Sequence, residues 1–220
     1  MRLKAGLYLE LIRTLFQAVD DEGKLRNRVV AFTSAVPKEG VSYVVHTLAT
    51  ELATQTQKRV LAVDALALQS LQVTEPKQVS RHCSETELDN LLTMSAQDLG
   101  LGLIGARGSS RAGSTTRSGP PAWGSRDWLA DPDYRNACIK ALRWNFDYVL
   151  IDCASLAISS EATTLAPTVD GIAVVVEAGR TRQGQIQRAQ QVVETTGGNF
   201  LGFVLNQRRY PIPNWLYQRL

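Results

Sequence analysis

The stretch SAVPKEGVS, residues 34 to 42, contains residue types that bind phosphate groups. It follows an apolar run and precedes a segment with helical periodicity, which is where a phosphate-binding loop lies in an α/β protein. Such a loop uses glycine to turn backbone amides toward phosphate oxygens, a lysine to reach the terminal phosphates and a hydroxyl to hold magnesium. Gly40 and Ser42 occupy two of these positions, but Val41 stands where the lysine is needed. The stretch indicates either a nucleotide site or one that has lost its phosphate-binding cation.

Two aspartates end apolar runs elsewhere in the chain. Asp64 closes VLAVD, and Asp152 closes VLID. A carboxylate in this place can hold a metal-bound water, and the carboxyl ends of parallel strands share one edge of a sheet. An aspartate after an apolar run is also a common helix cap or turn residue. The order of the two aspartates and the loop predicts that all three meet at one site.

The elements that position these residues follow from six short apolar runs that alternate with helical patterns. The runs cover residues 28–34, 59–65, 101–106, 147–153, 171–178 and 200–206. Helices are expected near residues 44–54, 133–145, 160–167 and 181–196. This alternation predicts an α/β fold, a three-layer αβα sandwich around a mostly parallel sheet.

The length of 220 residues predicts a single domain that spans 1–220. Residues 1–22 read as an N-terminal amphipathic helix, with apolar residues every four positions at Leu7, Leu11, Leu15 and Val19. This helix either covers its own domain or mediates self-association. The tail, residues 207–220, combines arginines with aromatic residues, and both docking on the domain and contact with a membrane partner stay open.

Residues 107–126, RGSSRAGSTTRSGPPAWGSR, interrupt the pattern. Because this segment has almost nothing to bury, we expect a flexible surface loop. Its four arginines offer a second interpretation, a grip on an acidic partner or on lipid headgroups.

Composition excludes several classes of function. The net charge of +3 is too small to indicate nucleic acid as a partner. The three cysteines form no C-x-x-C pair and only two histidines accompany them, so no metal centre is expected, and Cys153 reads as a core residue rather than a nucleophile. No apolar run approaches the roughly 20 residues that cross a bilayer, and the first residues do not form a signal peptide. We therefore expect a cytoplasmic protein.

The order of these motifs over about residues 8 to 220 resembles that of the bacterial tyrosine kinases of capsule and exopolysaccharide synthesis, within the MinD/ParA-type P-loop ATPases. Members of that family carry a loop of the type S-A-L-P-G-E-G-K-S, an apolar run followed by D-x-D-x-R, and an apolar run followed by D-[ST]-P. The resemblance implies a nucleotide-binding loop that consists of Lys38, Glu39, Gly40, Val41 and Ser42.

The same resemblance implies roles for residues outside the loop. Asp64 and Asp152 match the catalytic aspartates, and Ser42 with Asp152 would hold Mg²⁺ if nucleotide binds. Asn206 matches an asparagine that reads adenine. The remaining two matches, Glu10 and Arg13, belong to the E-x-x-R-x-x-R helix through which these kinases pack into rings. The implied cofactor is ATP or ADP with Mg²⁺.

Four departures from the family pattern concern chemistry. They are Val41 for the lysine, Lys38 for a loop glycine, Leu66 for the second aspartate, and Cys153 with Ala154 after the Walker B aspartate. Phe16 also replaces the last arginine of the ring-forming helix. Lys38 either swings toward the phosphates as a substitute or belongs to a solvated turn. The departures predict that the fold is kept while phosphoryl transfer is impaired and nucleotide binding is weak or absent.

Three functions follow, in order of preference. The first is a catalytically impaired tyrosine-kinase-like protein that acts as a binding or regulatory subunit in exopolysaccharide or capsule biosynthesis and export. The second is an active ATP-dependent protein-tyrosine autokinase of the same pathway, and the third is a MinD/ParA-like ATPase switch. The expected partners are a transmembrane chain-length determinant, or polysaccharide co-polymerase, and further copies of this chain. Such a partner would hold the protein peripherally at the inner membrane.

Overall fold

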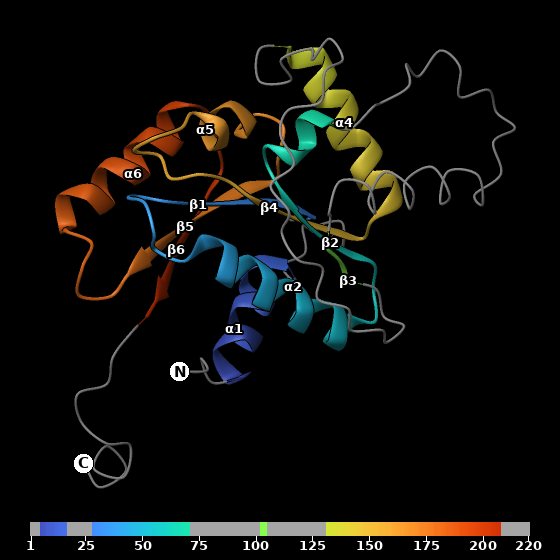
Figure 1. Ribbon diagram of the computed structural model, residues 1–220, viewed down its shortest axis with the longest axis horizontal. Coiled ribbons are helices and arrows are strands. Elements are labelled where there is room, and N and C mark those ends of the chain that lie inside the picture. The colour runs from blue at the N-terminus through green and yellow to red at the C-terminus, as the bar shows by residue number, and fades with distance from the viewer. Residues whose placement is uncertain (1–4, 17–27, 71–101, 105–130, 208–220) are drawn as a thin grey trace, which may run out of the picture.

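A six-stranded sheet forms the middle layer of this computed structural model, which describes residues 5–16, 28–70, 102–104 and 131–207 (Figure 1). The spatial order of the strands is β3-β2-β4-β1-β5-β6. Their bounds are Val29–Ser34 for β1, Val60–Asp64 for β2, Gly102–Ile104 for β3, Tyr148–Asp152 for β4, Gly171–Glu177 for β5 and Phe200–Asn206 for β6. Each strand lies within one of the six apolar runs, so the strand predictions are confirmed.

The sheet is mostly parallel, as the sequence predicts. β1 pairs in parallel with β4 and β5, β2 with β4, and β5 with β6. Only β3, at the edge beside β2, runs antiparallel among the described strands. Reversing an edge strand leaves the central parallel ladder intact. The strands that carry the predicted site therefore end at the same edge.

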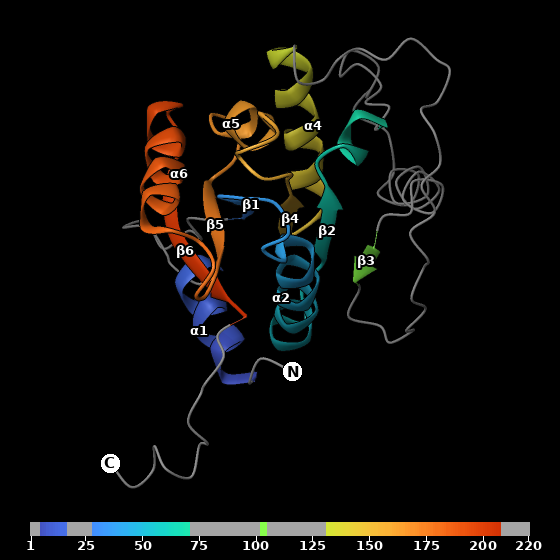
Figure 2. The same cartoon turned by 60° about the vertical axis from the view of Figure 1, so that its left-hand side comes forward.

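Helices cover both faces of the sheet (Figures 1 and 2). On one face lie α1, Ala5–Phe16, and α2, Val41–Thr56. On the other lie α4, Pro132–Asn145, α5, Glu161–Leu165, and α6, Gln183–Thr195. A short 3₁₀ helix, η1, spans Ala67–Ser70 after β2. The three layers confirm the predicted αβα sandwich.

The alternation of side chains along β1 explains why its sequence is continuously apolar. Val30 and Phe32 pack toward α1 and α2, whereas Val29 and Ala31 belong to the core under α4 and α5. All four are fully buried. A strand covered on both faces must be apolar at every position, not at every second one.

α1 packs on its own domain. Its buried side chains are Tyr8, Ile12, Leu15 and Phe16. Phe16 meets Tyr148 edge to face, with ring centroids 5.6 Å apart and planes at 83°, an arrangement that aromatic rings favour. Of the apolar stripe expected from the sequence, Leu15 is buried and Leu11 is half-buried. The covering role of the helix is confirmed.

Glu10 and Arg13 lie exposed on α1. Their role in self-association stays a prediction. The predicted loop at 107–126 lies outside the described residues, as does the tail apart from Gln207. Among helices in the described ranges, none combines the length and hydropathy that a bilayer crossing requires.

Asp170 joins several elements at the opposite, amino-terminal edge of the sheet. Its Oδ2 atom accepts hydrogen bonds from the backbone amides of Arg28 and Val29, both at 2.7 Å. The Arg143 guanidinium donates to both carboxylate oxygens, at 2.7 and 2.9 Å. Burial alone would raise the pKa of Asp170, but the hydrogen bonds from Arg143 and the two amides outweigh it and lower the pKa. The carboxylate therefore ties β1 to α4 and to the start of β5.

We expect Asp170→Asn to lower the free energy of unfolding by roughly 1.5–3 kcal/mol near neutral pH, because hydrogen bonds to a charged group are lost. Since the folded-state pKa is lowered, this stabilisation is complete above the ordinary aspartate value of about 3.9 and is lost as pH falls through the lower folded value. Urea unfolding at several pH values measures the difference. Glu194→Gln, an exposed change on α6, is the control. A difference that stays constant down to acid pH would contradict the role of the charge.

Candidate functional site

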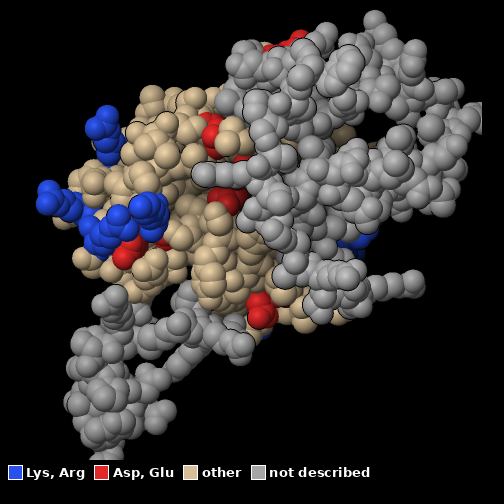
Figure 3. All heavy atoms as spheres, viewed as in Figure 1, with Lys and Arg blue, Asp and Glu red and all other residues tan. Residues whose placement is uncertain are grey.

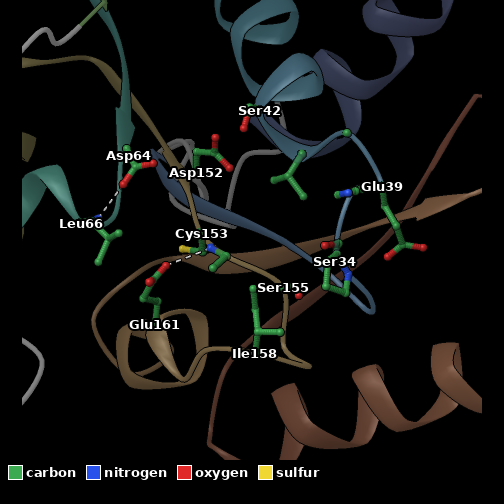
Figure 4. A pocket seen from close by; sticks show the side chains of 15 residues that line it. Ser34, Glu39, Ser42, Asp64, Leu66, Asp152, Cys153, Ser155, Ile158 and Glu161 are labelled. Atoms are coloured by element: carbon green, nitrogen blue, oxygen red, sulfur yellow. Dashed lines mark hydrogen bonds between the residues drawn. The ribbon is translucent and has the colours of Figure 1, made fainter. Parts of the chain in front are cut away.

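A cavity of about 320 Å³ lies at the carboxyl edge of the sheet, among the loop after β1, the ends of β2 and β4, and the start of α5 (Figure 4). Its lining consists of Ser34, Pro37, Lys38, Glu39, Gly40, Val41, Ser42, Asp64, Leu66, Asp152, Cys153, Ala154, Ser155, Ile158 and Glu161. The cavity brings together the loop and the two aspartates that the sequence predicted to meet. Asn206, Glu10 and Arg13 are not among these residues.

The loop bends through two residues in the left-handed backbone region. Gly40 has φ 85°, and Lys38 has φ 69°. A residue with a β-carbon rarely adopts this conformation, so Lys38 occupies a backbone position that favours glycine, the residue that the family pattern has there. α2 begins at the next residue after Gly40 and receives no side-chain cap from it. Gly40 has no side chain to accept hydrogen bonds from the first N–H groups of α2. These groups, with the partial positive charge of the helix start, can therefore face a ligand.

Glu39 fastens this loop to the end of β5. Its side chain has no solvent exposure. Oε2 accepts a hydrogen bond from the Val36 amide at 2.9 Å, and Oε1 accepts one from the Glu177 amide at 3.1 Å and one from the Thr181 hydroxyl. In Figure 4 the carboxylate points away from Asp152. Although Glu39 borders the cavity, its carboxylate is occupied in holding the loop.

Asn206 supports the loop from β6. Its side-chain amide is buried and donates to the Glu39 carbonyl at 2.8 Å, while its Oδ1 accepts from the Gln207 amide at 2.9 Å. A β-carbon added to Gly40 would lie 2.4 Å from Asn206 Nδ2. Close approach and positive φ therefore both require glycine here. The adenine-reading role of Asn206 stays a prediction, and its contacts give it a supporting role.

Asp64 and Asp152 are neighbours in the β2–β4 register. Burial, first of all, raises the pKa of Asp152; the negative charges of Asp64 and Glu161 raise it further, and a hydrogen bond from Ser42 acts in the opposite direction. Asp64 Oδ1 accepts a hydrogen bond from the Leu66 amide at 2.8 Å. The pairing of Ser42 with Asp152 is the contact expected of residues that share a magnesium ion in a phosphate-binding loop.

Sequence reasoning missed two polar lining residues, Glu161 and Ser155, and the apolar Ile158. Glu161 is 5% exposed, and its Oε2 accepts a hydrogen bond from the Ala154 amide at 2.9 Å. Ser155 is 4% exposed, and its hydroxyl has no hydrogen-bond partner in the described part of the chain. Both follow β4 within ten residues, at the edge where ligands bind in this fold. That position was the signal available in the sequence.

No lysine or arginine in the described part of the chain takes the place of the phosphate-binding lysine, which Val41 replaces. Val41 is 9% exposed and joins the apolar core beneath α2. Lys38 is the one lysine or arginine in the described lining, and it is exposed. Arg180 lies outside this lining, donating to the Lys38 carbonyl at 3.5 Å and to Glu177 at 2.8 Å. Figure 3 shows several basic side chains at the left of the molecule, with acidic side chains among them and others nearer the middle.

Cys153 is a core residue, as the sequence indicates. Its side chain is 2% exposed, and burial is the main cause that raises the pKa of its thiol well above the ordinary value. Within the described ranges, no group of three or more His, Cys, Asp or Glu side chains is arranged to hold a metal ion. The raised pKa of Cys153 does not favour a reactive thiolate. The described residues also do not offer a complete set of protein ligands for a metal ion.

We expect Gly40→Ala to lower the free energy of unfolding more than Gly197→Ala does. Both glycines have positive φ, but a β-carbon at Gly197 meets no atom within 4 Å. The positive φ alone costs roughly 1–2 kcal/mol, and the contact with Asn206 adds about 1–3 kcal/mol at Gly40. Thermal or urea unfolding of the two variants gives the comparison. Equal losses would show that the approach of Asn206 does not constrain the loop.

No protein-family model matches the sequence. A 74-residue segment, 34% of this chain, is 34% identical to the tyrosine-protein kinase CpsD of Streptococcus agalactiae and spans 32% of that protein. The succinoglycan biosynthesis transport protein ExoP of Rhizobium meliloti is 31% identical in an alignment of 192 residues that covers 82% of this chain and 22% of ExoP. The chain thus matches about a third or less of the length of these relatives.

The solved kinase domain of VpsO has the same fold. It superposes with a TM-score of 0.60 at 20% sequence identity, over 93% of this chain and 95% of that domain. The sequence matches, the shared fold and the order of the three motifs along one sheet edge agree with the resemblance found in the sequence. In sequence and in fold, this chain therefore resembles the bacterial tyrosine kinases among the P-loop ATPases.

Proposed function

We propose that this chain is a catalytically impaired tyrosine-kinase-like protein that acts as a binding or regulatory component of exopolysaccharide or capsule biosynthesis and export. Two relatives support the pathway: the tyrosine-protein kinase CpsD, and ExoP, whose name is succinoglycan biosynthesis transport protein. The observation that carries the impairment is Val41, an apolar core side chain at the place of the phosphate-binding lysine.

The size of the missing interaction supports impaired phosphoryl transfer. Two unit charges about 4 Å apart interact by roughly 4 kcal/mol at an effective dielectric constant near 20. Losing such a contact weakens phosphate binding by up to about 10²- to 10³-fold. The loss is larger for transfer itself, because negative charge spreads over the oxygens of the migrating group. Valine supplies neither charge nor hydrogen bond.

Other parts of a nucleotide site are retained. Ser42 and Asp152 fit the two protein contacts of a nucleotide-bound magnesium ion, and the start of α2 can face phosphate oxygens. When bound, magnesium nucleotide would supply the phosphoryl group, and these residues would orient it. We therefore infer weak binding of ATP or ADP with Mg²⁺ and no efficient transfer.

Lys38 favours a second candidate, an active autokinase, because it lines the cavity. Its exposed side chain would have to turn toward the phosphates from a backbone position that the family pattern gives to glycine. If Lys38 performs this role, Lys38→Ala would abolish nucleotide binding and phosphotyrosine formation together. We prefer the impaired form, since the lysine position itself belongs to the core.

The proposed partner is a transmembrane chain-length determinant, or polysaccharide co-polymerase, that would hold the chain peripherally at the inner membrane. The ExoP match supports this idea, because 82% of this chain aligns with a fifth of a much longer transport protein. Association with further copies of the chain through Glu10 and Arg13 belongs to the same proposal. Both residues are exposed and available on α1.

Titration of magnesium ATP into the purified chain and its Val41→Lys variant tests the impairment. We expect binding in the natural chain to be weak, and the variant to gain roughly 10²- to 10³-fold, because the ammonium group restores the phosphate contact. Calorimetry measures the affinities, and circular dichroism checks that the variant is folded.

Thr50→Lys is the matched control for this titration. It adds the same charge to an exposed position of α2 without altering the cavity lining. Binding should stay as weak as in the natural chain. Micromolar affinity with phosphotyrosine formation by the unaltered chain would instead establish the active autokinase.

A further inference from the structure

The cavity carries more negative than positive side chains. Asp64, Asp152 and Glu161 line it together, and Lys38 is the one basic residue in the described lining. The ion pairs among the described residues that involve acidic groups near this edge, such as Arg180 with Glu177, join groups outside the lining. Asp64, Asp152 and Glu161 each have a hydrogen-bond donor but no described ion-pair partner. The cavity is therefore electrostatically suited to a cation.

Ser155 gives a second, independent indication of a ligand. Its Oγ atom is buried without a hydrogen-bond partner in the described part of the chain, and the residue lies on the cavity wall with the acidic side chains (Figure 4). A hydroxyl can both donate and accept, and leaving it unpaired in a buried place is unfavourable. A polar group that enters the cavity can satisfy this hydroxyl.

The opening of the cavity contains aliphatic side chains. Leu66 is 54% exposed and Ile158 is 69% exposed, and both line the cavity. Exposed aliphatic groups beside carboxylates, of which Asp64 is exposed, Asp152 half-buried and Glu161 buried, suit a ligand with an apolar stem and a charged end. Arginine and lysine have this construction, because their methylene groups pack on apolar surface while the charged group reaches polar partners.

The spacing of the acidic groups favours a guanidinium over a metal ion. No three acidic, histidine or cysteine side chains in the described ranges are arranged to coordinate a metal. A guanidinium is larger and presents five N–H donors, so it can contact separate acceptors at once. An additional anion, by contrast, would bring negative charge toward Asp152, Asp64 and Glu161.

We propose that this cavity binds the guanidinium of an arginine side chain presented by a partner polypeptide, with Asp64, Asp152, Glu161 and Ser155 as acceptors. The methylene groups of the arginine pack against Leu66 and Ile158. The inference rests on the proposed function in one respect: a cavity that no longer holds a triphosphate tightly is free for a protein ligand. It assigns to the cavity the contact through which a binding subunit recognises its partner.

A short peptide with blocked ends and one arginine among glycine and serine residues is a direct probe. Backbone amide chemical shifts of the full chain, labelled with ¹⁵N, report binding at residues 34–42 and 152–161. We expect a dissociation constant on the order of 1 mM for this isolated side chain, weakened by added salt because the contact is ionic. The same peptide with neutral citrulline in place of arginine should bind at least about tenfold more weakly.

Two variants test the acceptors. Asp64→Asn removes one charge, and Ser155→Ala removes the unpaired hydroxyl; each should weaken arginine binding roughly tenfold. Since Ser155→Ala deletes a buried group without a described partner, its melting temperature should equal or exceed that of the natural chain. Asp133→Asn, an exposed change on α4 outside the lining, should leave binding unaltered.

Equal binding of the arginine and citrulline peptides would overturn the inference. So would full retention of binding in both acceptor variants. The inference also fails if the arginine peptide does not bind at concentrations well above about 1 mM. The ATP titration decides the proposed function separately. Weak nucleotide binding without arginine binding would leave the proposed function standing and remove this inference. Tight nucleotide binding, together with binding of the arginine peptide when no nucleotide is present, would remove the proposed function and leave the arginine site standing.

Discussion

The carboxylate of Glu39 is the interaction on which the shape of the site depends. It lies in the interior, where it accepts hydrogen bonds from the Val36 amide, the Glu177 amide and the Thr181 hydroxyl. Because the same residue offers its carbonyl to Asn206, the loop is connected to both β5 and β6. A buried carboxylate needs such donors, since an unpaired charge in the interior is costly. The loop is therefore held by protein contacts that remain when the phosphate-binding lysine is absent.

Val41 contributes to the apolar core of the fold but brings no charge to the cavity. The residue belongs both to the cavity wall and to the apolar core beneath α2. The sheet does not depend on the chemistry at its edge, because its stability comes from continuous apolar strands such as β1 and β4, covered on both faces. A protein of this kind can exchange the ligand of its edge cavity while its architecture stays the same.

Much of the fold and part of the site could be predicted from the sequence. Apolar runs predicted all six strands, and the shared carboxyl edge of parallel strands predicted the meeting of Asp64 and Asp152. Glu161 and Ser155 were missed, because neither belongs to a spacing pattern. Their position after β4 indicates the correct edge of the sheet, but it does not show how the chain turns there. The orientation of Glu39 was equally hidden, since one of its donors, the Glu177 amide, is 138 residues away along the chain.

Phe16 anchors α1 to the core of the domain. At the position where the E-x-x-R-x-x-R pattern has its last arginine, this chain inserts an aromatic ring into the core against Tyr148. Lifting the helix would expose both rings to water. A molecule that contacts Glu10 and Arg13 therefore meets a surface that is already ordered, and its association does not carry the conformational entropy loss of folding a helix on contact.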